Sequence, residues 1–369
     1  MPRGTRDGIL IAGGGVAGCL AALAMARLRP DVPLLIVEEQ ARFGGPGAQI
    51  LCLDGLDEAA RALGEAAATA AWPGLYLALP GKSRKLKAPL ACIGGDGLHA
   101  IMVETLRPDQ YLLGTKVVAL RDDALVLDGG ETIKAEGAID ARGAANLSML
   151  ELLYEARTER EVELAAPHGV DRPVLIDATV PRAGPGHIEV TPVGDRALRI
   201  ADIVSSERAQ GDAEAGARID SYLAARGWRV VEVLAERTLS RPLPIGGDFA
   251  AFWRIGGARV ARLGLRGGFL DPLNGTTAAD ALRNGALLAR QRDFSGAALH
   301  DLFEASARQA WRRREPRRAI NAAIAAAPPE TRLALVDRLY GLDAGTVTRL
   351  LSERTGLADR MRIQRALRG

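Results

Sequence analysis

Residues 8–26 read GILIAGGGVAGCLAALAMA, and this stretch decides the fold. The apolar run at residues 8–12 predicts a buried strand, the glycines after it predict a tight turn, and residues 15–28 predict a helix. A second apolar run at residues 34–37 predicts another strand, which ends at Glu38. Strand, helix and strand form a βαβ unit, so the chain is expected to be an α/β protein with a Rossmann-type domain.

The spacing of the glycines indicates a dinucleotide site. Gly13 permits the turn, Gly15 lets backbone N–H groups approach a pyrophosphate at the positive end of the helix, and Gly18 allows helix and strand to pack closely. Glu38 is placed to accept hydrogen bonds from ribose hydroxyls. The alternative is a glycine-rich turn without a ligand. The predicted cofactor contacts in this unit are Gly13, Gly15, Val16, Ala17, Gly18, Glu38 and Glu39.

The composition excludes several classes of protein. The 369 residues are 48% hydrophobic and 25% charged, which fits two packed domains and not a disordered or fibrous chain. A net charge of +3 is too small for a protein that neutralises nucleic acid, so no such partner is expected. Cys19, Cys52 and Cys92 form no CxxC pair, which argues against structural zinc and a disulfide framework and favours a reducing compartment. Residues 8–26 are uncharged, but three consecutive glycines argue against a membrane-spanning helix.

Two later glycine turns favour FAD over NAD. Asp140-Ala141-Arg142-Gly143 closes an apolar strand, and residues 266–275 (RGGFLDPLNG) follow an expected strand at 259–265 and precede a helix. This order resembles the p-hydroxybenzoate hydroxylase class of flavoproteins. In that class the late turn sets a helix N-terminus against the flavin ring, where it favours negative charge on the reduced flavin. The further predicted FAD contacts are Asp140, Arg142, Gly143, Pro272, Asn274 and Gly275.

The remaining chain predicts a second domain inserted into the first. Residues 48–71 look weakly helical, residues 111–140 predict a small β-meander, and residues 160–204 predict an antiparallel sheet with one polar face. From residue 276 onwards the pattern is mostly helical. We expect an FAD-binding domain (1–74, 97–148 and 254–295), an antiparallel, β-rich substrate-binding domain (75–96 and 149–253) and a C-terminal helical layer (296–369).

Over nearly its whole length the chain resembles the bacterial lycopene β-cyclase family, flavoproteins that close rings at the ends of linear carotenoids. The resemblance rests on GGGVAG, LPGKSRKLKAPL and AIDARG, on APHGVDRPVLIDATV at Ala166–Val180 and on LPIGGDFAAFW at Leu243–Trp253. It continues through ARLGLRGGFLDPLNG, RLYGL and LADRMRI. The order and spacing of these pieces carry it.

Three departures from the family pattern affect the expected site. Pro46-Gly47-Ala48-Gln49-Ile50 stands where the family has Asn and then a stretch bearing His and Trp, and residues 186–191 lack the family's aromatic side chains. The strand that carries the family's acidic pair reads Leu198-Arg199-Ile200-Ala201-Asp202, so alanine takes the place of the expected catalytic acid. In a regular strand Asp202 faces away from Ala201, and only a β-bulge or a register change would bring it round. The alternative is a structural Asp202.

The resemblance implies a redox-neutral reaction. A carboxyl group of raised pKa protonates an alkene, an apolar pocket protects the carbocation, and reduced FAD stabilises it, with NAD(P)H as a candidate electron source. The candidate donors, in order of preference, are Asp202, Glu189, Glu207 and Asp271. His99, His168, His187 and His300 have no metal-ligand spacing, so no metal is expected.

A carotenoid or related isoprenoid dissolves in lipid, so we expect a cytoplasmic protein peripheral to the inner face of the membrane, with carotenoid-pathway enzymes as further candidate partners. Lys82, Arg84, Lys85, Lys87 and the run at 311–318 (WRRREPRR) are candidate contacts to anionic headgroups; a solvated helix face is the alternative for the run. Two other functions stay open. One is a flavoprotein of the same ancestry with redox or isomerase chemistry on another isoprenoid or polycyclic substrate, and the other is a non-catalytic carotenoid- or flavin-binding partner.

Overall fold

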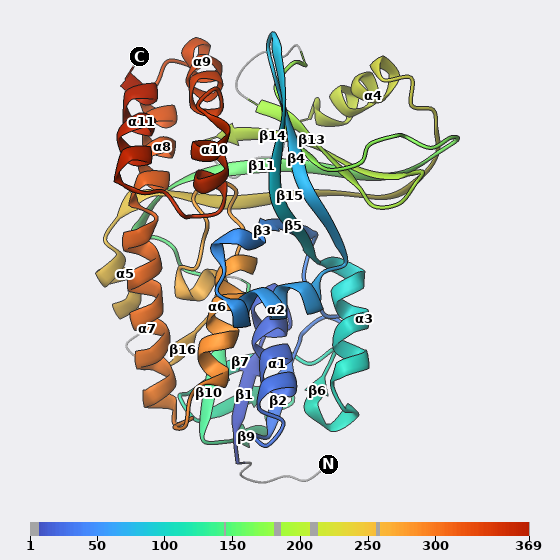
Figure 1. The fold of residues 1–369 in the computed structure, drawn as a ribbon. Coiled ribbons are helices and arrows are strands. Elements are labelled where there is room, and N and C mark those ends of the chain that lie inside the picture. Colours follow the sequence, from blue (N-terminus) through green and yellow to red (C-terminus); the bar gives the residue numbers. More distant parts are fainter. Residues whose placement is uncertain (1–6, 144, 181–185, 207–212, 256–258, 369) are drawn as a thin grey trace.

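The computed structural model describes residues 7–143, 145–180, 186–206, 213–255 and 259–368. Within these ranges the strands form three sheets, and the molecule has a lower part built on the N-terminal βαβ unit and an upper part built on a long antiparallel sheet (Figure 1). Helices from the C-terminal end of the chain stand beside the upper sheet. The predicted α/β class, with a β-rich second part and C-terminal helices, is confirmed.

The lower part contains a parallel sheet of the Rossmann type. Its described strands, in spatial order, are β16 (Ala261–Arg262), β10 (Gly137–Asp140), β1 (Ile9–Ala12), β2 (Leu34–Val37) and β6 (Tyr111–Leu112). A 3-10 turn at Pro108–Gln110 leads into β6. The accompanying helices are α1 (Val16–Leu28), α2 (Glu58–Ala67), α3 (Gly95–Thr105), α6 (Ala278–Ala289) and α7 (Gly296–Arg313).

Strand β1 is buried on both faces, as its continuous apolar run predicts. Ile9 and Ile11 pack with the apolar residues of α1, whereas Leu10 and Ala12 face a small antiparallel meander. The meander consists of β7 (Val117–Leu120), β8 (Ala124–Leu127) and β9 (Thr132–Lys134). The expected strand at 259–265 is shorter than predicted: after β16 the chain turns into a 3-10 segment, Gly264–Gly267, because Gly264 (φ +57°) and Gly268 (φ +71°) adopt left-handed backbone that ends a strand.

The upper part is a curled, largely antiparallel sheet. Its described strands, in spatial order, are β15 (Val230–Gly247), β11 (Leu150–Leu164), β14 (Ala197–Ser206), β13 (Gly186–Pro192), β12 (Val174–Asp177), β4 (Ala70–Leu79), β5 (Lys82–Gly94) and β3 (Ala48–Cys52). The weak helix expected at 48–71 is therefore only partly right. Residues 48–52 pair with the end of β5, a 3-10 turn follows at Leu53–Gly55, and α2 comes after it, because strand pairing outweighs the local preference of alanine.

Helices cover the two faces of this sheet differently. On one face α4 (Ala215–Ala225) packs Ile219, Tyr222 and Leu223 against apolar residues of β11, β13 and β14. On the other side stand the C-terminal helices α8 (Glu315–Ala326), α9 (Pro329–Tyr340), α10 (Ala344–Leu351) and α11 (Leu357–Arg368), with the short α5 (Phe249–Arg254) below them. Figure 1 shows α4 and the C-terminal helices at opposite ends of the upper part.

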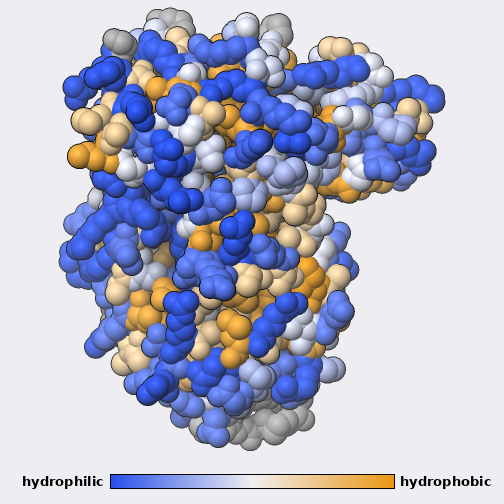
Figure 2. Space-filling view, viewed as in Figure 1, coloured by the Kyte–Doolittle hydropathy of each residue, from blue (hydrophilic) through white to orange (hydrophobic). Residues whose placement is uncertain are grey.

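Among the described residues, no helix combines the length and hydropathy needed to cross a bilayer. Figure 2 shows mixed hydropathy on one face of the molecule, with small groups of apolar residues among hydrophilic ones in both the upper and the lower part. The uncharged segment around the glycine turn lies inside the domain instead, since residues 16–25 of α1 are all buried.

Candidate active site

The glycine turn after β1 has the geometry that its spacing predicts. Gly13 has φ +102°, and a Cβ there would lie 2.7 Å from the carbonyl oxygen of Ala141. A Cβ on Gly18 would lie 1.9 Å from the carbonyl oxygen of Gly13, so α1 packs against the turn too closely for any side chain. A Cβ on Gly15 would meet no atom within 4 Å. The turn is therefore tightly packed at Gly13 and Gly18. At Gly15 it leaves free space next to the N-terminus of α1, where Val16 and Ala17 begin the helix.

The two acidic residues after β2 have different positions. The Glu38 carboxylate accepts hydrogen bonds from the N–H groups of Gly14 at 2.5 Å and Gln40 at 2.8 Å, which places it on the glycine turn. Glu39 points outward and forms a half-exposed ion pair with Lys116 at 3.4 Å. The geometry supports a ribose contact for Glu38 and argues against one for Glu39.

Asp140 and Arg142 lie beside the glycine turn at the end of β10. The Arg142 guanidinium donates to both Asp140 oxygens at 2.9 and 2.8 Å, and Arg266 approaches the same carboxylate at 3.3 Å. These three side chains line a cavity of about 280 Å³, whereas Gly143 is exposed. The cluster carries more positive than negative charge, so it is suited to an anionic group.

The loop from Asp271 to Thr277 is held rigidly in front of α6. The Asp271 carboxylate accepts from the N–H of Leu273 at 3.0 Å, and the Asn274 side chain accepts from the N–H of Thr276 at 3.1 Å. Gly275 has φ +64°, and a Cβ there would lie 2.6 Å from the Cβ of Arg241. Asn321 of α8 donates to the carbonyl of Pro272. The predicted flavin loop therefore lies against β15 on one side and α8 on the other.

The N-terminus of α6 has a partner that the sequence did not reveal. The side-chain oxygen of Gln49 in β3 accepts hydrogen bonds from the N–H groups of Thr277 at 2.8 Å and Ala278 at 2.9 Å. Gln49 belongs to the segment that departs from the family pattern. An amide oxygen thus occupies the end of the helix that was expected to face the flavin.

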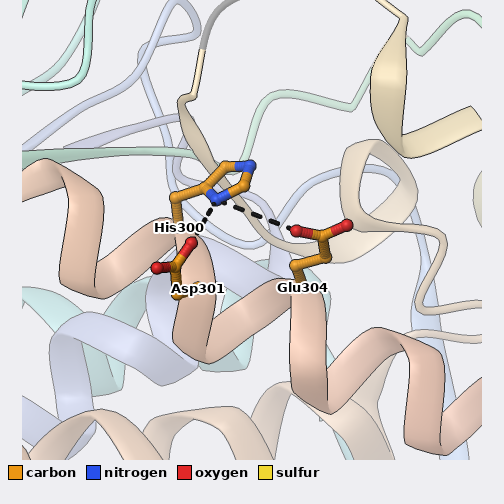
Figure 3. Close-up of side chains that lie close together, drawn as sticks. All are labelled: His300, Asp301 and Glu304. Carbon is orange, nitrogen blue, oxygen red and sulfur yellow. Dashed lines mark hydrogen bonds and ion pairs between the residues drawn. The ribbon is translucent and has the colours of Figure 1, made fainter.

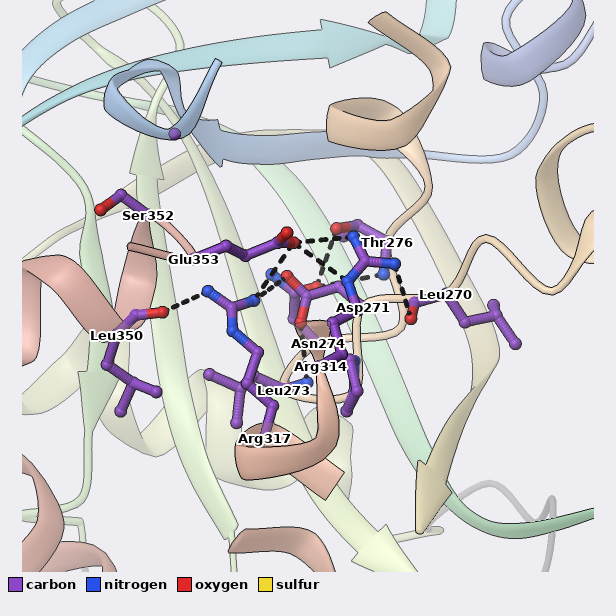
Figure 4. A network of polar contacts seen from close by, with 12 residues as sticks. Leu270, Asp271, Leu273, Asn274, Thr276, Arg314, Arg317, Leu350, Ser352 and Glu353 are labelled. Atoms are coloured by element: carbon purple, nitrogen blue, oxygen red, sulfur yellow. Dashed lines mark hydrogen bonds and ion pairs between the residues drawn. The ribbon is translucent and has the colours of Figure 1, made fainter. Parts of the chain in front are cut away.

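A network of ion pairs fixes the far side of the same loop (Figure 4). Arg317 pairs with Asp271, and Arg314 pairs with Asp280 and, at 2.7 Å, with Glu353. Arg314 also donates to the carbonyl of Leu270 at 3.1 Å. Asp271 was a candidate proton donor, but its carboxylate is already engaged in an ion pair with Arg317. This contact argues against Asp271 as the acid.

The principal cavity, of about 450 Å³, lies between the upper sheet and the C-terminal helices. Most of its wall is apolar, formed among others by Leu77, Leu175, Leu243, Ile320, Ile324 and Val336. Asn274 and Thr276 of the predicted flavin loop also contribute to the wall, so the cavity and the loop are adjacent. Its floor is the sheet face that carries Glu155, Arg157 and Glu189.

The floor is a cluster of charged side chains that alternate along neighbouring strands. Arg157 of β11 donates to Glu159 at 2.5 Å and to both oxygens of Glu189 in β13 at 2.5 and 3.2 Å. Burial opposes the charged forms, but Arg157 lowers the pKa of Glu159 and the two carboxylates raise the pKa of Arg157. We call Glu155, Arg157, Glu159, Glu189 and Arg241 the floor cluster.

Glu155 is the exception within the floor cluster. Its side chain is buried, and its Oε1 lies 3.7 Å from Arg157 and 3.8 Å from Arg241, beyond hydrogen-bond distance. Within the described ranges Glu155 Oε1 has no hydrogen-bond partner. Burial raises the pKa of Glu155, and the charges of the neighbouring carboxylates add to the effect, against the opposing effect of the two arginines.

Asp202, the preferred donor from the sequence, lies on the opposite face of the sheet. Ala201 pairs in register with Glu159 and Glu189, and Asp202 pairs with Thr158 and Ile188, with no bulge between them. The side chain of Asp202 is fully buried, and Arg218 of α4 donates to it at 2.7 Å. The strand alternation is therefore as predicted, and it corrects the choice of Asp202: the side chain cannot reach the cavity.

Of the other candidate proton donors, the structure describes Glu189 but not Glu207. Glu189 lies in the cavity wall, and Glu207 lies outside the described residues. Sequence reasoning missed Glu155, Arg157 and Glu159, although the signal was present. The segment EARTERE places charged residues at every second position from Glu155, which in a strand predicts a charged face.

The basic segments expected at a membrane are largely engaged within the protein. Lys82 pairs with Asp337 at 3.0 Å, Lys85 pairs with Asp171 at 3.3 Å, and Arg84 donates to the carbonyl of Leu342 at 2.6 Å. In the run at 311–318, Arg314, Arg317 and Arg318 are buried and Arg312 is exposed. This corrects the interpretation of the run, which mainly joins helices to one another.

One group among the described residues has ligand atoms close enough to hold a metal ion: His300, Asp301 and Glu304 of α7 (Figure 3). His300 Nδ1 lies 3.0 Å from Asp301 and 3.9 Å from Glu304. Asp301 also pairs with Arg259, and Glu304 pairs with Arg308 at 2.6 Å. Because arginines already balance both carboxylates, the group has an ordinary structural explanation.

Comparison with known proteins gives a consistent result along the whole chain. The model of the family described as lycopene cyclase protein matches residues 8–367. The chain is 27% identical over 358 residues to the lycopene beta-cyclase of Pantoea ananas, covering 96% of this chain and 93% of that protein. It is 29% identical over 365 residues to the lycopene beta-cyclase of a Paracoccus species, covering 96% and 92%.

Solved structures show the same fold at much lower identity. A geranylgeranyl bacteriochlorophyll reductase-like protein from Thermoplasma acidophilum superposes with a TM-score of 0.64 at 13% identity, covering 98% of this chain and 96% of that one. A flavin-dependent halogenase from Xanthomonas campestris gives a TM-score of 0.63 at 13% identity, covering 98% and 94%. The fold is therefore one that flavin-dependent enzymes use.

Proposed function

The chain belongs to the lycopene cyclase family, and from this membership we propose that it is an FAD-dependent enzyme that closes rings at the ends of linear carotenoids. One observation carries the proposal: a largely apolar cavity beside the predicted flavin loop has buried carboxyl groups on its floor. Acid-catalysed cyclisation requires these two features together, because a proton must be delivered to an alkene while water is kept from the carbocation.

The residues of the N-terminal unit fit a dinucleotide. The space in front of Gly15, the α1 N-terminus and the carboxylate of Glu38 supply an opening, N–H donors and a ribose acceptor. Gly13, Gly15, Val16, Ala17, Gly18 and Glu38 would hold the pyrophosphate and ribose, and Asn274 and Gly275 lie in the loop expected beside the ring. When bound in its reduced form, FAD supplies negative charge that stabilises a carbocation, and NAD(P)H would supply the electrons.

The chain's own residues would perform three tasks. The apolar wall, including Leu175, Ile320 and Ile324, binds the polyene and excludes water. The floor cluster supplies the proton and, through its carboxylates, stabilises positive charge that develops in the substrate. Arg157 keeps Glu159 and Glu189 in place by charge-assisted hydrogen bonds.

We also propose that the protein takes its substrate from a membrane surface. The support comes from apolar residues and not from the basic runs. Leu333 of α9 lies in the cavity wall and is 39% exposed, and α11, which packs beside α9, exposes Leu357 and Met361. These exposed apolar side chains are suited to insertion into the headgroup region of a membrane, and Leu333 is also part of the cavity wall. Binding to vesicles of anionic phospholipid that weakens in a Leu333→Ser, Leu357→Ser variant would support this proposal, and unchanged binding would contradict it.

Product analysis tests the proposed reaction. The chain is expressed in a lycopene-accumulating host and its pigments are identified by chromatography and mass. We expect monocyclic or dicyclic products with the mass of lycopene, and a deuterium atom gained for each ring when the purified, flavin-loaded enzyme acts in D2O. Unchanged lycopene with the flavin bound would contradict the cyclase, and a product of altered mass would favour redox chemistry on an isoprenoid.

A further inference from the structure

We propose that Glu155 is the proton donor of this enzyme, so that the acid lies on β11 and not on β14, where Ala201 occupies the expected position. The inference rests on the proposed function and identifies the residue that performs its first step. It follows from the side chains that face the cavity and from what each of them contacts.

The sheet geometry places Glu155 on the correct face. Strands β11 and β14 are neighbours in register, with Glu155 opposite Ser205 and Glu159 opposite Ala201. Side chains at these paired positions share one face of the sheet. Glu155 and Ser205 both line the cavity, whereas Ala201 lies between Glu159 and Glu189, its paired neighbours on β11 and β13. A carboxyl group can therefore reach the cavity from β11 without any change in the backbone of β14.

The contacts of the cluster distinguish Glu155 from the other two carboxyl groups. Glu159 and Glu189 each accept short, charge-assisted hydrogen bonds from Arg157. Glu155 Oε1 accepts none within the described part of the chain, although the residue is only 6% exposed. An isolated carboxylate is costly to bury, so a buried carboxyl group without hydrogen bonds favours the neutral, protonated form.

The surroundings of Glu155 suit a group that must be neutral before the reaction and charged after it. The charged and titratable groups facing it are Arg157 and Glu159 on its own strand, Arg241 on β15, and Glu189 and His187 on β13. The nearby carboxylates disfavour a further negative charge while the cavity is at rest. As the proton leaves, the guanidinium groups of Arg157 and Arg241, both within 4 Å, stabilise the new anion.

The proposed step balances in protons and electrons. The O–H bond of Glu155 breaks and a C–H bond forms at the terminal alkene, which leaves a tertiary carbocation. A neighbouring double bond attacks this cation and forms the ring C–C bond. A ring C–H bond then breaks and its proton returns to the Glu155 carboxylate, so that no electron is gained or lost overall.

The test compares three variants of the flavin-loaded enzyme in single-turnover assays with lycopene in liposomes. Glu155→Gln keeps size and polarity but removes the acid, and we expect ring closure to slow by about 100-fold or more. Glu155→Asp keeps an acid and should recover part of the rate. Asp202→Asn, on the other face of the sheet, is the matched control and should form products at close to the wild-type rate. Flavin absorbance and melting temperature verify that each variant is folded.

The outcomes separate this inference from the proposed function. An active wild-type enzyme whose Glu155→Gln variant keeps its rate within about threefold would overturn Glu155 as the donor. A wild-type enzyme that forms no ring product would overturn the proposed function and this inference with it. If Glu155→Gln does not fold, the wild-type pH profile decides: the rate must fall as pH rises through the raised pKa of Glu155, and a rate that does not fall contradicts the proposal.

Discussion

Two buried clusters of charge, one on the cavity floor and one at the loop that begins with Asp271, are built differently. In the floor cluster, Glu155 and Glu159 each have an oxygen without a hydrogen bond within the described residues. In the second cluster, formed by Asp271, Asp280, Arg314, Arg317 and Glu353, each carboxylate accepts a hydrogen bond from an arginine, and none of its buried oxygens lacks a partner within the described residues. Burial opposes the Glu353 anion, but the surrounding arginines lower its pKa well below the usual value, whereas burial raises the pKa of Glu155.

This difference separates a structural role from a chemical one. A fully paired network stabilises one arrangement of the helices and the loop at Asp271, and removal of one partner leaves a buried charge. An incompletely paired network favours the neutral form of one group and lowers the stability of the fold. Such an arrangement is typical of a group that takes part in a reaction. The contrast predicts opposite results when each cluster is mutated.

The largest effect is expected in the second cluster. Arg314→Met should lower the free energy of unfolding by about 3–5 kcal/mol, because Asp280 and Glu353 lose a buried partner. Chemical denaturation of the purified protein measures the change. Arg308→Met is the control, since Arg308 pairs with Glu304 near the surface and should contribute less than about 1 kcal/mol. Equal losses of unfolding free energy in the two variants would show that the buried network stabilises the fold no more than a surface ion pair does.

A smaller effect with a characteristic pH dependence is expected in the floor cluster. Because the pKa of Glu155 is raised in the folded state, the folded protein holds a proton that the unfolded chain releases. Stability is therefore lost as pH rises from the ordinary glutamate pKa through the raised one, with a slope of up to about 1.4 kcal/mol per pH unit. Glu155→Gln lacks this contribution.

Urea unfolding of the wild type and Glu155→Gln at a series of pH values measures the difference. The variant should gain stability relative to the wild type with increasing pH. Parallel curves across the whole range would show that Glu155 has an ordinary pKa, and the contrast between the two clusters would then fail.

The smallest effect is expected for a neutral contact near the second cluster. Gln49→Met removes the acceptor for the N–H groups of Thr277 and Ala278 at the start of α6, the helix that carries Asp280. We expect a loss of about 1 kcal/mol, typical of a helix cap. Thermal unfolding with Gln40→Met as the exposed control gives the comparison. A loss as large as that of Arg314→Met would mean that charge pairing is not what distinguishes the second cluster.

Local patterns predicted the lower part of the molecule well. The strand at residues 9–12, the glycine turn and α1 depend on neighbouring residues, so spacing alone located them. Residues 48–52 were misjudged because their strand forms only by pairing with β5, about forty residues away. Likewise the run at 311–318 looked like a surface patch, because its partners Asp271, Asp280 and Glu353 are distant in sequence.

The candidate site was predictable only in part for the same reason. Alternation along one strand predicted that Asp202 and Ala201 face opposite ways, and the structure agrees. The importance of Glu155 depends on what lies across the sheet and above it, in β15, β13 and α8. These neighbours are distant in sequence, so the sequence alone does not predict their contacts with Glu155. The charged residues at every second position from Glu155 to Glu161 do predict that this face of the strand is charged.

The unbroken register between β11 and β14 also limits how such a site can change during evolution. A single substitution in β14 cannot bring Asp202 into the cavity, because the residue would have to change faces and an insertion would disturb the pairing on both sides. A substitution on β11 meets no such obstacle, since its side chain already faces the cavity. A lost acid can therefore be replaced only at positions whose side chains already face the cavity, such as Glu155 on β11 or Ser205 on β14, and these positions form one face of the sheet that spans several strands.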